Sequence, residues 1–135
     1  MKIVIIGGVA GGAGAAARLR RLDEHAEIVL FERGPHISYS NCCLPYFLGG
    51  VVKSSDSLLM MSPASFEMRF NVRIHINSGV VSIDRAAHTV TVRKTEDSST
   101  YTESYDKLIL ATGAAALRPG TVAGSDSPNV FTVKT

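Results

Sequence analysis

The sequence has no membrane-spanning run, little net charge, no signal peptide and few cysteines. No apolar run approaches the roughly 18 residues of a membrane-spanning helix, and the formal net charge of +2 is too small to indicate binding to nucleic acid or to a membrane surface. The apolar start at residues 2–6 breaks at Gly7 and leads into an arginine-bearing segment, which does not fit a signal peptide. The only cysteines are Cys42 and Cys43. We therefore expect a cytoplasmic protein with free thiols.

The two cysteines are neighbours, which disfavours a disulfide between them. Adjacent α-carbons lie ~3.8 Å apart, whereas a disulfide usually spans ~4.4–6.8 Å. We therefore expect one thiol to act alone. A helix that begins near Asn41 would favour the thiolate through its amides and dipole. The alternative is that Cys42 and Cys43 are two small buried hydrophobic residues. Composition alone favours this alternative, and only the residues that flank the cysteines favour a reactive thiol.

The pattern of apolar residues predicts an α/β fold. The length of 135 residues, 45% of them hydrophobic, fits one globular domain. A strand at residues 2–6, a helix to about residue 25 and a strand at 27–31 form a strand–helix–strand unit, whose strands should be parallel. Leu19 and Leu22 should face inward from the helix, with its arginines exposed.

The rest of the chain predicts a helix, two further strands of the main sheet and an antiparallel meander. The helix spans residues 63–70, with Ser62 as its N-cap. The strands are expected at 72–76 and 107–111, and the meander at 80–84, 89–94 and 100–105. Residues 114–129 are rich in Ala, Gly, Pro and Ser and predict a loop.

A dinucleotide-binding fingerprint follows the first strand. In Gly-x-Gly-x-x-Gly, the three glycine places are held by Gly7, Val9 and Gly12, so the second glycine is replaced. The context supports the motif, because it lies between a strand and a helix and Glu32 follows Gly12 by 20 residues, as a ribose-binding acid should. The alternative is a glycine-rich turn that only packs the helix on the strand. Position and spacing together favour a nucleotide site.

Residues 1–113 resemble the flavin-binding part of the pyridine nucleotide-disulfide oxidoreductases. The similarity is strongest to the single-cysteine branch, which includes coenzyme A disulfide reductases, NAD(P)H-dependent polysulfide or persulfide reductases, and NADH oxidases and peroxidases. Three stretches carry the resemblance, residues 7–21, 31–46 and 105–113. It implies a Rossmann-like, three-layer FAD-binding fold with a parallel sheet and a three-stranded antiparallel meander.

The resemblance also implies site residues. FAD would contact the following residues: Gly7, Gly8, Val9, Ala10, Gly11, Gly12, Glu32, Arg33, Asn41, Cys42, Val81, Ala111, Thr112 and Gly113. Cys42 would be the redox thiol, and Cys43 stands where the family usually has Gly or Ala. The substrate would meet Gly14, Arg18, Arg21, Ser38, Asn41 and Arg69. Gly14 departs from the usual Ser or Thr, and the arginines of the first helix could equally be an ordinary solvated face. No metal is expected.

The implied activity is electron transfer from NAD(P)H through FAD to Cys42, which reduces coenzyme A disulfide or a related persulfide or polysulfide. The alternatives are an NADH oxidase or peroxidase that uses a cysteine sulfenic acid, and an inactive nucleotide-binding fragment. Residues 1–113 would be the N-terminal part of the FAD-binding domain. Residues 114–135 would be a loop and linker toward an NAD(P)H-binding domain that this sequence lacks. We expect a homodimeric parent protein and little turnover by these residues alone.

Overall fold

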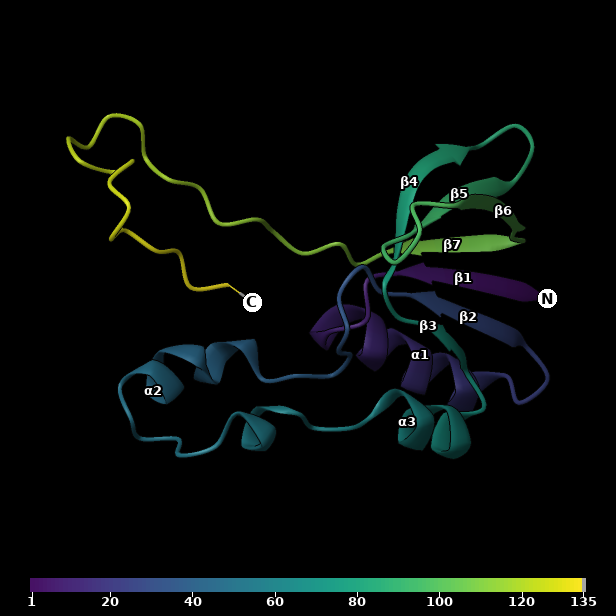
Figure 1. Cartoon of the computed structure of the whole chain (residues 1–135). Coiled ribbons are helices and arrows are strands. Elements are labelled where there is room, and N and C mark those ends of the chain that lie inside the picture. The colour runs from purple at the N-terminus through teal and green to yellow at the C-terminus, as the bar shows by residue number, and fades with distance from the viewer. Residues whose placement is uncertain (135) are drawn as a thin grey trace.

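A parallel sheet forms the centre of the computed structural model, which describes residues 1–134. Its four strands lie in the order β3-β2-β1-β7 (Figure 1). Their bounds are Arg73–His75 for β3, Glu27–Phe31 for β2, Lys2–Ile6 for β1 and Lys107–Leu110 for β7. β1 pairs in parallel with both β2 and β7, so the predicted parallel strand–helix–strand unit is confirmed.

Alternate residues of β1 and β2 face two different layers, as the two-residue period of a strand requires. One set packs against α1 (Ala10–Leu22) and α3 (Pro63–Phe70). The other set packs against a second sheet of β4 (Ser78–Asp84), β5 (Thr89–Lys94) and β6 (Thr100–Ser104). The first set is Ile3, Ile5, Ile28 and Leu30, and the second is Val4, Ile6, Val29 and Phe31. The predicted three layers and antiparallel meander are confirmed.

The two main helices differ in how well the sequence predicts them. α3 begins and ends at the predicted residues. Its start is capped by the Ser62 side chain, which accepts a hydrogen bond from the Ser65 amide at 3.1 Å. α1 ends at Leu22, short of the predicted residue 25. The inward prediction for Leu22 is wrong, since its side chain is 66% exposed. Asp23 follows the last residue of the helix, and its side chain accepts hydrogen bonds from the amides two and three residues later, those of His25 and Ala26.

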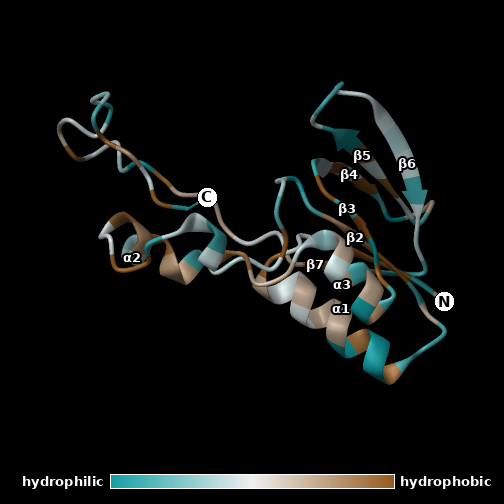
Figure 2. Ribbon diagram, turned by 60° about the horizontal axis from the view of Figure 1, so that its bottom comes forward, coloured by the Kyte–Doolittle hydropathy of each residue, from teal (hydrophilic) through white to brown (hydrophobic). Residues whose placement is uncertain are grey.

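Two segments project from the layers (Figure 1). The first runs from residue 41 to 60 and contains η1 (Asn41–Cys43), α2 (Leu44–Leu48) and η2 (Ser55–Leu58). The second is the C-terminal tail, residues 114–134, which contains no helix or strand, as predicted for 114–129. Both carry apolar side chains (Figure 2), and several are exposed, among them Leu48, Val51, Leu117 and Phe131.

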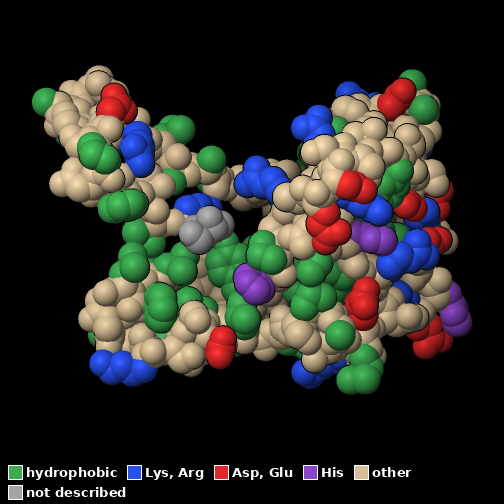
Figure 3. All heavy atoms as spheres, viewed as in Figure 1, with side chains coloured by type: hydrophobic (Ala, Val, Ile, Leu, Met, Phe, Trp, Pro, Cys, Tyr) green, Lys and Arg blue, Asp and Glu red, His purple; other side chains and the backbone are tan. Residues whose placement is uncertain are grey.

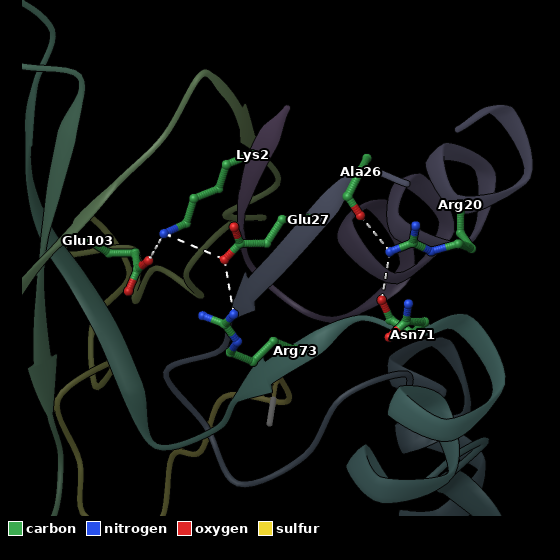
Figure 4. A network of polar contacts seen from close by, with 7 residues as sticks. All are labelled: Lys2, Arg20, Ala26, Glu27, Asn71, Arg73 and Glu103. Atoms are coloured by element: carbon green, nitrogen blue, oxygen red, sulfur yellow. Dashed lines mark hydrogen bonds and ion pairs between the residues drawn. The ribbon is translucent and has the colours of Figure 1, made fainter. Parts of the chain in front are cut away.

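Charged side chains tie the layers together at the amino end of β1 (Figure 4). Lys2 lies between Glu103 of β6 and Glu27 of β2, and Arg73 of β3 donates to Glu27 at 2.9 Å. On the helical side, Arg20 donates hydrogen bonds to backbone carbonyls, including those of Ala26 and Asn71. None of the helices formed by residues 1–134 is long and apolar enough to cross a membrane.

Candidate functional site

The loop between β1 and α1 is held in very close contact with its surroundings. The Gly7 amide donates to the Phe31 carbonyl at 2.8 Å, with φ of 101° at Gly7. A Cβ atom at Gly7 would lie 2.2 Å from the Ala111 carbonyl oxygen, and one at Gly12 would lie 1.7 Å from the Gly7 carbonyl oxygen. These contacts explain why the first and third places of the fingerprint are glycine.

Val9, at the second place of the fingerprint, is the N-cap of α1 and leaves the first amides of the helix free. Its side chain makes no capping hydrogen bond, and the first turn contains no acidic residue. The first-turn amides of a helix have no intrahelical acceptor, so they can receive a phosphate. The tight contact falls on Gly8 instead, where a Cβ atom would lie 2.8 Å from Ile37 Cγ2. The extra glycine therefore satisfies a packing demand next to the replaced one.

Glu32, directly after β2, accepts hydrogen bonds from two backbone amides, one of them in the glycine loop. Its Oε2 accepts from the Gly8 amide at 2.7 Å, and its Oε1 accepts from the Gly34 amide at 2.8 Å. A carboxylate oxygen can accept more than one hydrogen bond. Glu32 therefore keeps capacity for ribose hydroxyls while it orders the loop.

A cavity of about 400 Å³ opens beside this loop. It lies where β1, β2 and β7 end, which is where open parallel sheets bind their ligands. The glycine loop, the strand ends and the tail all contribute to its lining: Gly7, Val9, Ala10, Gly11, Glu32, Arg33, Tyr39, Asn41, residues 111–116, Thr132 and Lys134. Figure 3 shows a separate, wide notch between the tail and the meander, whose strands contribute no residue to the lining of this cavity. The free helix amides, the close backbone approach and the carboxylate fit an adenine dinucleotide.

The two thiols lie on η1, whose first residue lines this cavity, although neither cysteine is among the lining residues. Asn41 lines the cavity and Cys42 follows it directly. Cys42 is exposed, Cys43 is half-buried and both are free. The burial expected of two small hydrophobic residues is therefore absent at Cys42. The Ser40 hydroxyl, followed by the Cys43 thiol, lowers the pKa of Cys42 through hydrogen bonds.

Sequence reasoning missed Ser40. Its Oγ lies 3.4 Å from Cys42 Sγ and donates to Cys43 Sγ at 3.1 Å. A short helical turn does begin at Asn41, but the pKa of Cys42 is lowered chiefly by a hydrogen bond with a side chain and not by a helix terminus. A serine two residues before a cysteine carries no signal unless the turn that brings them together is known.

Tyr39 is a second residue that the sequence did not reveal. It lines both the 400 Å³ cavity and a neighbouring cavity of about 590 Å³. Its hydroxyl donates to the Lys134 carbonyl at 3.5 Å, which joins the tail to the cysteine segment. Burial, followed by the charge of Glu32, raises the pKa of Tyr39.

The remaining predicted residues do not line the 400 Å³ cavity. Val81 lies at the irregularity of β4 between Val80 and Ser82, 48% exposed. Ser38 has φ of 49°, and its amide donates to the Gly8 carbonyl at 2.9 Å. This hydrogen bond stabilises the glycine loop. The others lie exposed on helices: Gly14, Arg18 and Arg21 on α1, and Arg69 on α3. Their contacts with cofactor or substrate stay predictions.

Comparison with known proteins shows the family to which the chain belongs. The family model of pyridine nucleotide-disulphide oxidoreductase matches residues 1–135. The chain belongs to this family. Its members are FAD-binding flavoproteins that use NAD(P)H, which agrees with the fit of the loop and cavity to a dinucleotide.

The similar proteins include oxidoreductases with different named substrates. A coenzyme A disulfide reductase of Staphylococcus epidermidis is 40% identical over 120 residues, which are 89% of this chain and 27% of that protein. Reduced Bacillus anthracis CoADR-RHD matches with a TM-score of 0.86 and 47% identity, over 88% of this chain and 21% of that one. An NAD-dependent persulfide reductase from A. fulgidus matches with a TM-score of 0.91 and 33% identity, over 100% of this chain and 26% of that one. The chain thus spans about a quarter of the length of these relatives.

Proposed function

We propose that these residues form the flavin-binding portion of an oxidoreductase that passes electrons from NAD(P)H through FAD to Cys42. The reduced Cys42 would act on coenzyme A disulfide or a related persulfide or polysulfide. The observation that carries the proposal is the position of an exposed thiol, whose pKa is lowered by the Ser40 hydroxyl, directly after Asn41, a residue that lines the 400 Å³ cavity. The named relatives support the same choice of substrates.

In this proposal the first-turn amides of α1 hold the pyrophosphate of FAD and Glu32 holds the adenosine ribose. Gly7 and Gly12 admit the backbone at close range, and Thr112 and Gly113 close the cavity from the end of β7. FAD supplies the means to carry two electrons from the nicotinamide to sulfur. Residues 114–135 would lead toward an NAD(P)H-binding domain in a homodimeric parent protein.

The chemistry of the thiol is a disulfide exchange. The Cys42 thiolate attacks one sulfur of coenzyme A disulfide, so that a Cys42–coenzyme A disulfide forms and one coenzyme A leaves as a thiolate. Two electrons and one proton then cleave this mixed disulfide and restore the Cys42 thiolate with release of the second coenzyme A thiol. The exposure of Cys42 gives a bulky disulfide access to the sulfur. Arg18, Arg21 and Arg69 would bind the phosphates of coenzyme A.

A second candidate is an NADH oxidase or peroxidase that cycles through a Cys42 sulfenic acid. It is favoured by a water-forming NADH oxidase from Lactobacillus brevis, whose structure matches all of this chain with a TM-score of 0.89 and 30% identity. The same exposed thiolate would serve, because sulfenic acids form at low-pKa, accessible cysteines. The two candidates differ in the adduct that Cys42 carries.

Native mass spectrometry of the purified chain under non-reducing conditions, followed by denaturation of the same sample, tests the proposal. We expect FAD to be lost on denaturation and a reducible coenzyme A adduct to remain. Cys42→Ser should abolish the adduct, whereas the matched Cys43→Ser variant should keep it. An oxygen adduct on Cys42 without coenzyme A would favour the second candidate. The proposal would be contradicted if the purified chain contained no FAD and also formed no adduct when coenzyme A disulfide was added.

A further inference from the structure

Ser40 occupies a position between two sulfur atoms. Its hydroxyl oxygen lies 3.1 Å from Cys43 Sγ and 3.4 Å from Cys42 Sγ, both within hydrogen-bond range for sulfur. A hydroxyl has one proton to donate and two lone pairs to accept with. It can therefore donate to only one thiol at a time while it accepts from the other.

The two sulfurs compete unequally for that proton. Cys42 is exposed and Cys43 is half-buried, so water stabilises an anion better at Cys42. Once Cys42 is ionised, its sulfur is the stronger acceptor, since hydrogen bonds to charged groups are stronger than those between neutral ones. The hydroxyl then turns from Cys43 to Cys42, and the Cys43 thiol can donate to the Ser40 oxygen.

We propose that Ser40 is a positioning residue that directs its hydroxyl proton to Cys42 and keeps Cys43 as a protonated thiol behind it. The order of donation is Cys43 thiol to Ser40 hydroxyl to Cys42 thiolate. This gives Cys43 a role, as a neutral donor at the start of the relay, and explains how two adjacent thiols remain chemically distinct. The inference rests on the proposed function only in taking Cys42 as the redox thiol.

The turn that holds Ser40 does not depend on its side chain. The Ser40 amide donates to the Leu58 carbonyl at 2.8 Å, and its carbonyl accepts from the Cys43 amide at 3.1 Å. Removal of the hydroxyl should therefore leave the backbone of this segment in place. Ser40→Ala can consequently be read as a change in hydrogen bonding.

The test is limited alkylation of the purified chain with iodoacetamide at neutral pH, with the label assigned to Cys42 or Cys43 by tandem mass spectrometry. We expect Cys42 to be labelled first in the wild type. Ser40→Ala should slow its labelling by roughly two- to tenfold, the factor for one lost hydrogen bond, and should reduce the preference for Cys42. Ser40→Thr should restore both.

Two further variants complete the design. Cys43→Ala should also slow labelling of Cys42, because the relay loses its first donor. Ser57→Ala is the matched control, an exposed serine whose side chain makes no hydrogen bond within residues 1–134. Unchanged labelling in Ser40→Ala, or faster labelling of Cys43 than of Cys42 in the wild type, would overturn the inference. The readout needs neither FAD nor turnover, so its failure is separate from a failure of the proposed function.

Discussion

Two glycines of α1 should respond in opposite ways to the same substitution. In a helix, alanine is more favourable than glycine by roughly 0.5–1 kcal/mol. A Cβ atom at Gly14 would meet nothing within 4 Å, so Gly14→Ala should raise the free energy of unfolding by about that amount. At Gly12 the added atom would lie 1.7 Å from the Gly7 carbonyl oxygen.

The clash at Gly12 outweighs the helical gain. Real Cβ contacts essentially never fall below 3.0 Å, so the loop after β1 or the start of α1 must move by more than an ångström. Overpacking of this kind costs about 1–3 kcal/mol and at times more. After the gain in helix propensity is subtracted, Gly12→Ala should still be destabilising by about 2 kcal/mol.

Thermal unfolding followed by far-ultraviolet circular dichroism measures both variants against the wild type. The melting temperature should rise by about 3 °C in Gly14→Ala and fall by about 8 °C in Gly12→Ala, at about 4 °C per kcal/mol for a chain of this size. Gly14→Ala also serves as the control for the substitution itself. If Gly12→Ala proved as stable as the wild type, the close approach of Gly7 and Gly12 would be wrong.

Three further changes test other parts of the structure. Arg20 donates hydrogen bonds to five backbone carbonyls, so Arg20→Gln should lower the free energy of unfolding by about 2 kcal/mol, against less than about 0.5 kcal/mol for exposed Arg18→Gln. Glu32→Gln leaves one acceptor oxygen for two amides and should weaken FAD binding about tenfold in a fluorescence titration. Burial, then the charge of Arg73, lowers the pKa of His75 from 6.5. The unfolded chain thus takes up the proton first, and stability should decrease as the pH falls below 6.5, a decrease that His75→Phe should reduce in urea titrations.

Local signals explain which elements the sequence could predict. Strands β1 and β2 are short apolar runs. Their alternate residues form two sets, and each set is buried in a core on one face of the sheet. α3 begins at Pro63, directly after its N-cap Ser62, and both residues act on the first turn of the helix. Such features depend on near neighbours in sequence, so they can be read without knowledge of the fold.

Long-range contacts explain the misses. Arg20 reaches the carbonyls of Phe70 and Asn71, some fifty residues away, and helps to fix the turn that ends α1 at Leu22. β4 begins at Ser78, two residues before the predicted start, where the Ser78 amide donates to the Glu32 carbonyl at 2.9 Å. Neither contact leaves a periodic pattern in the sequence.

The residues of the candidate site likewise fall into those with a local sequence signal and those that depend on contacts in the folded chain. Spacing and context were enough to propose the glycine loop and Glu32 as cofactor-binding residues, because the fingerprint is a local strand–turn–helix signal. Ser40 and Tyr39 act through contacts with a neighbouring thiol and with the tail, which only the folded chain reveals.

Stability and ligand binding therefore depend on different parts of this chain. The three layers are held by buried residues of β1, β2, α1, α3 and β5. The cavity, by contrast, takes much of its lining from residues 111–113, which follow β7, and from residues 114–116, Thr132 and Lys134 of the tail, which contains no helix or strand. Under the proposed function, the glycine loop would present its amides from the layered core, while the tail would help to enclose a bound dinucleotide. Changes in the core should act first on folding, and changes in the tail on affinity.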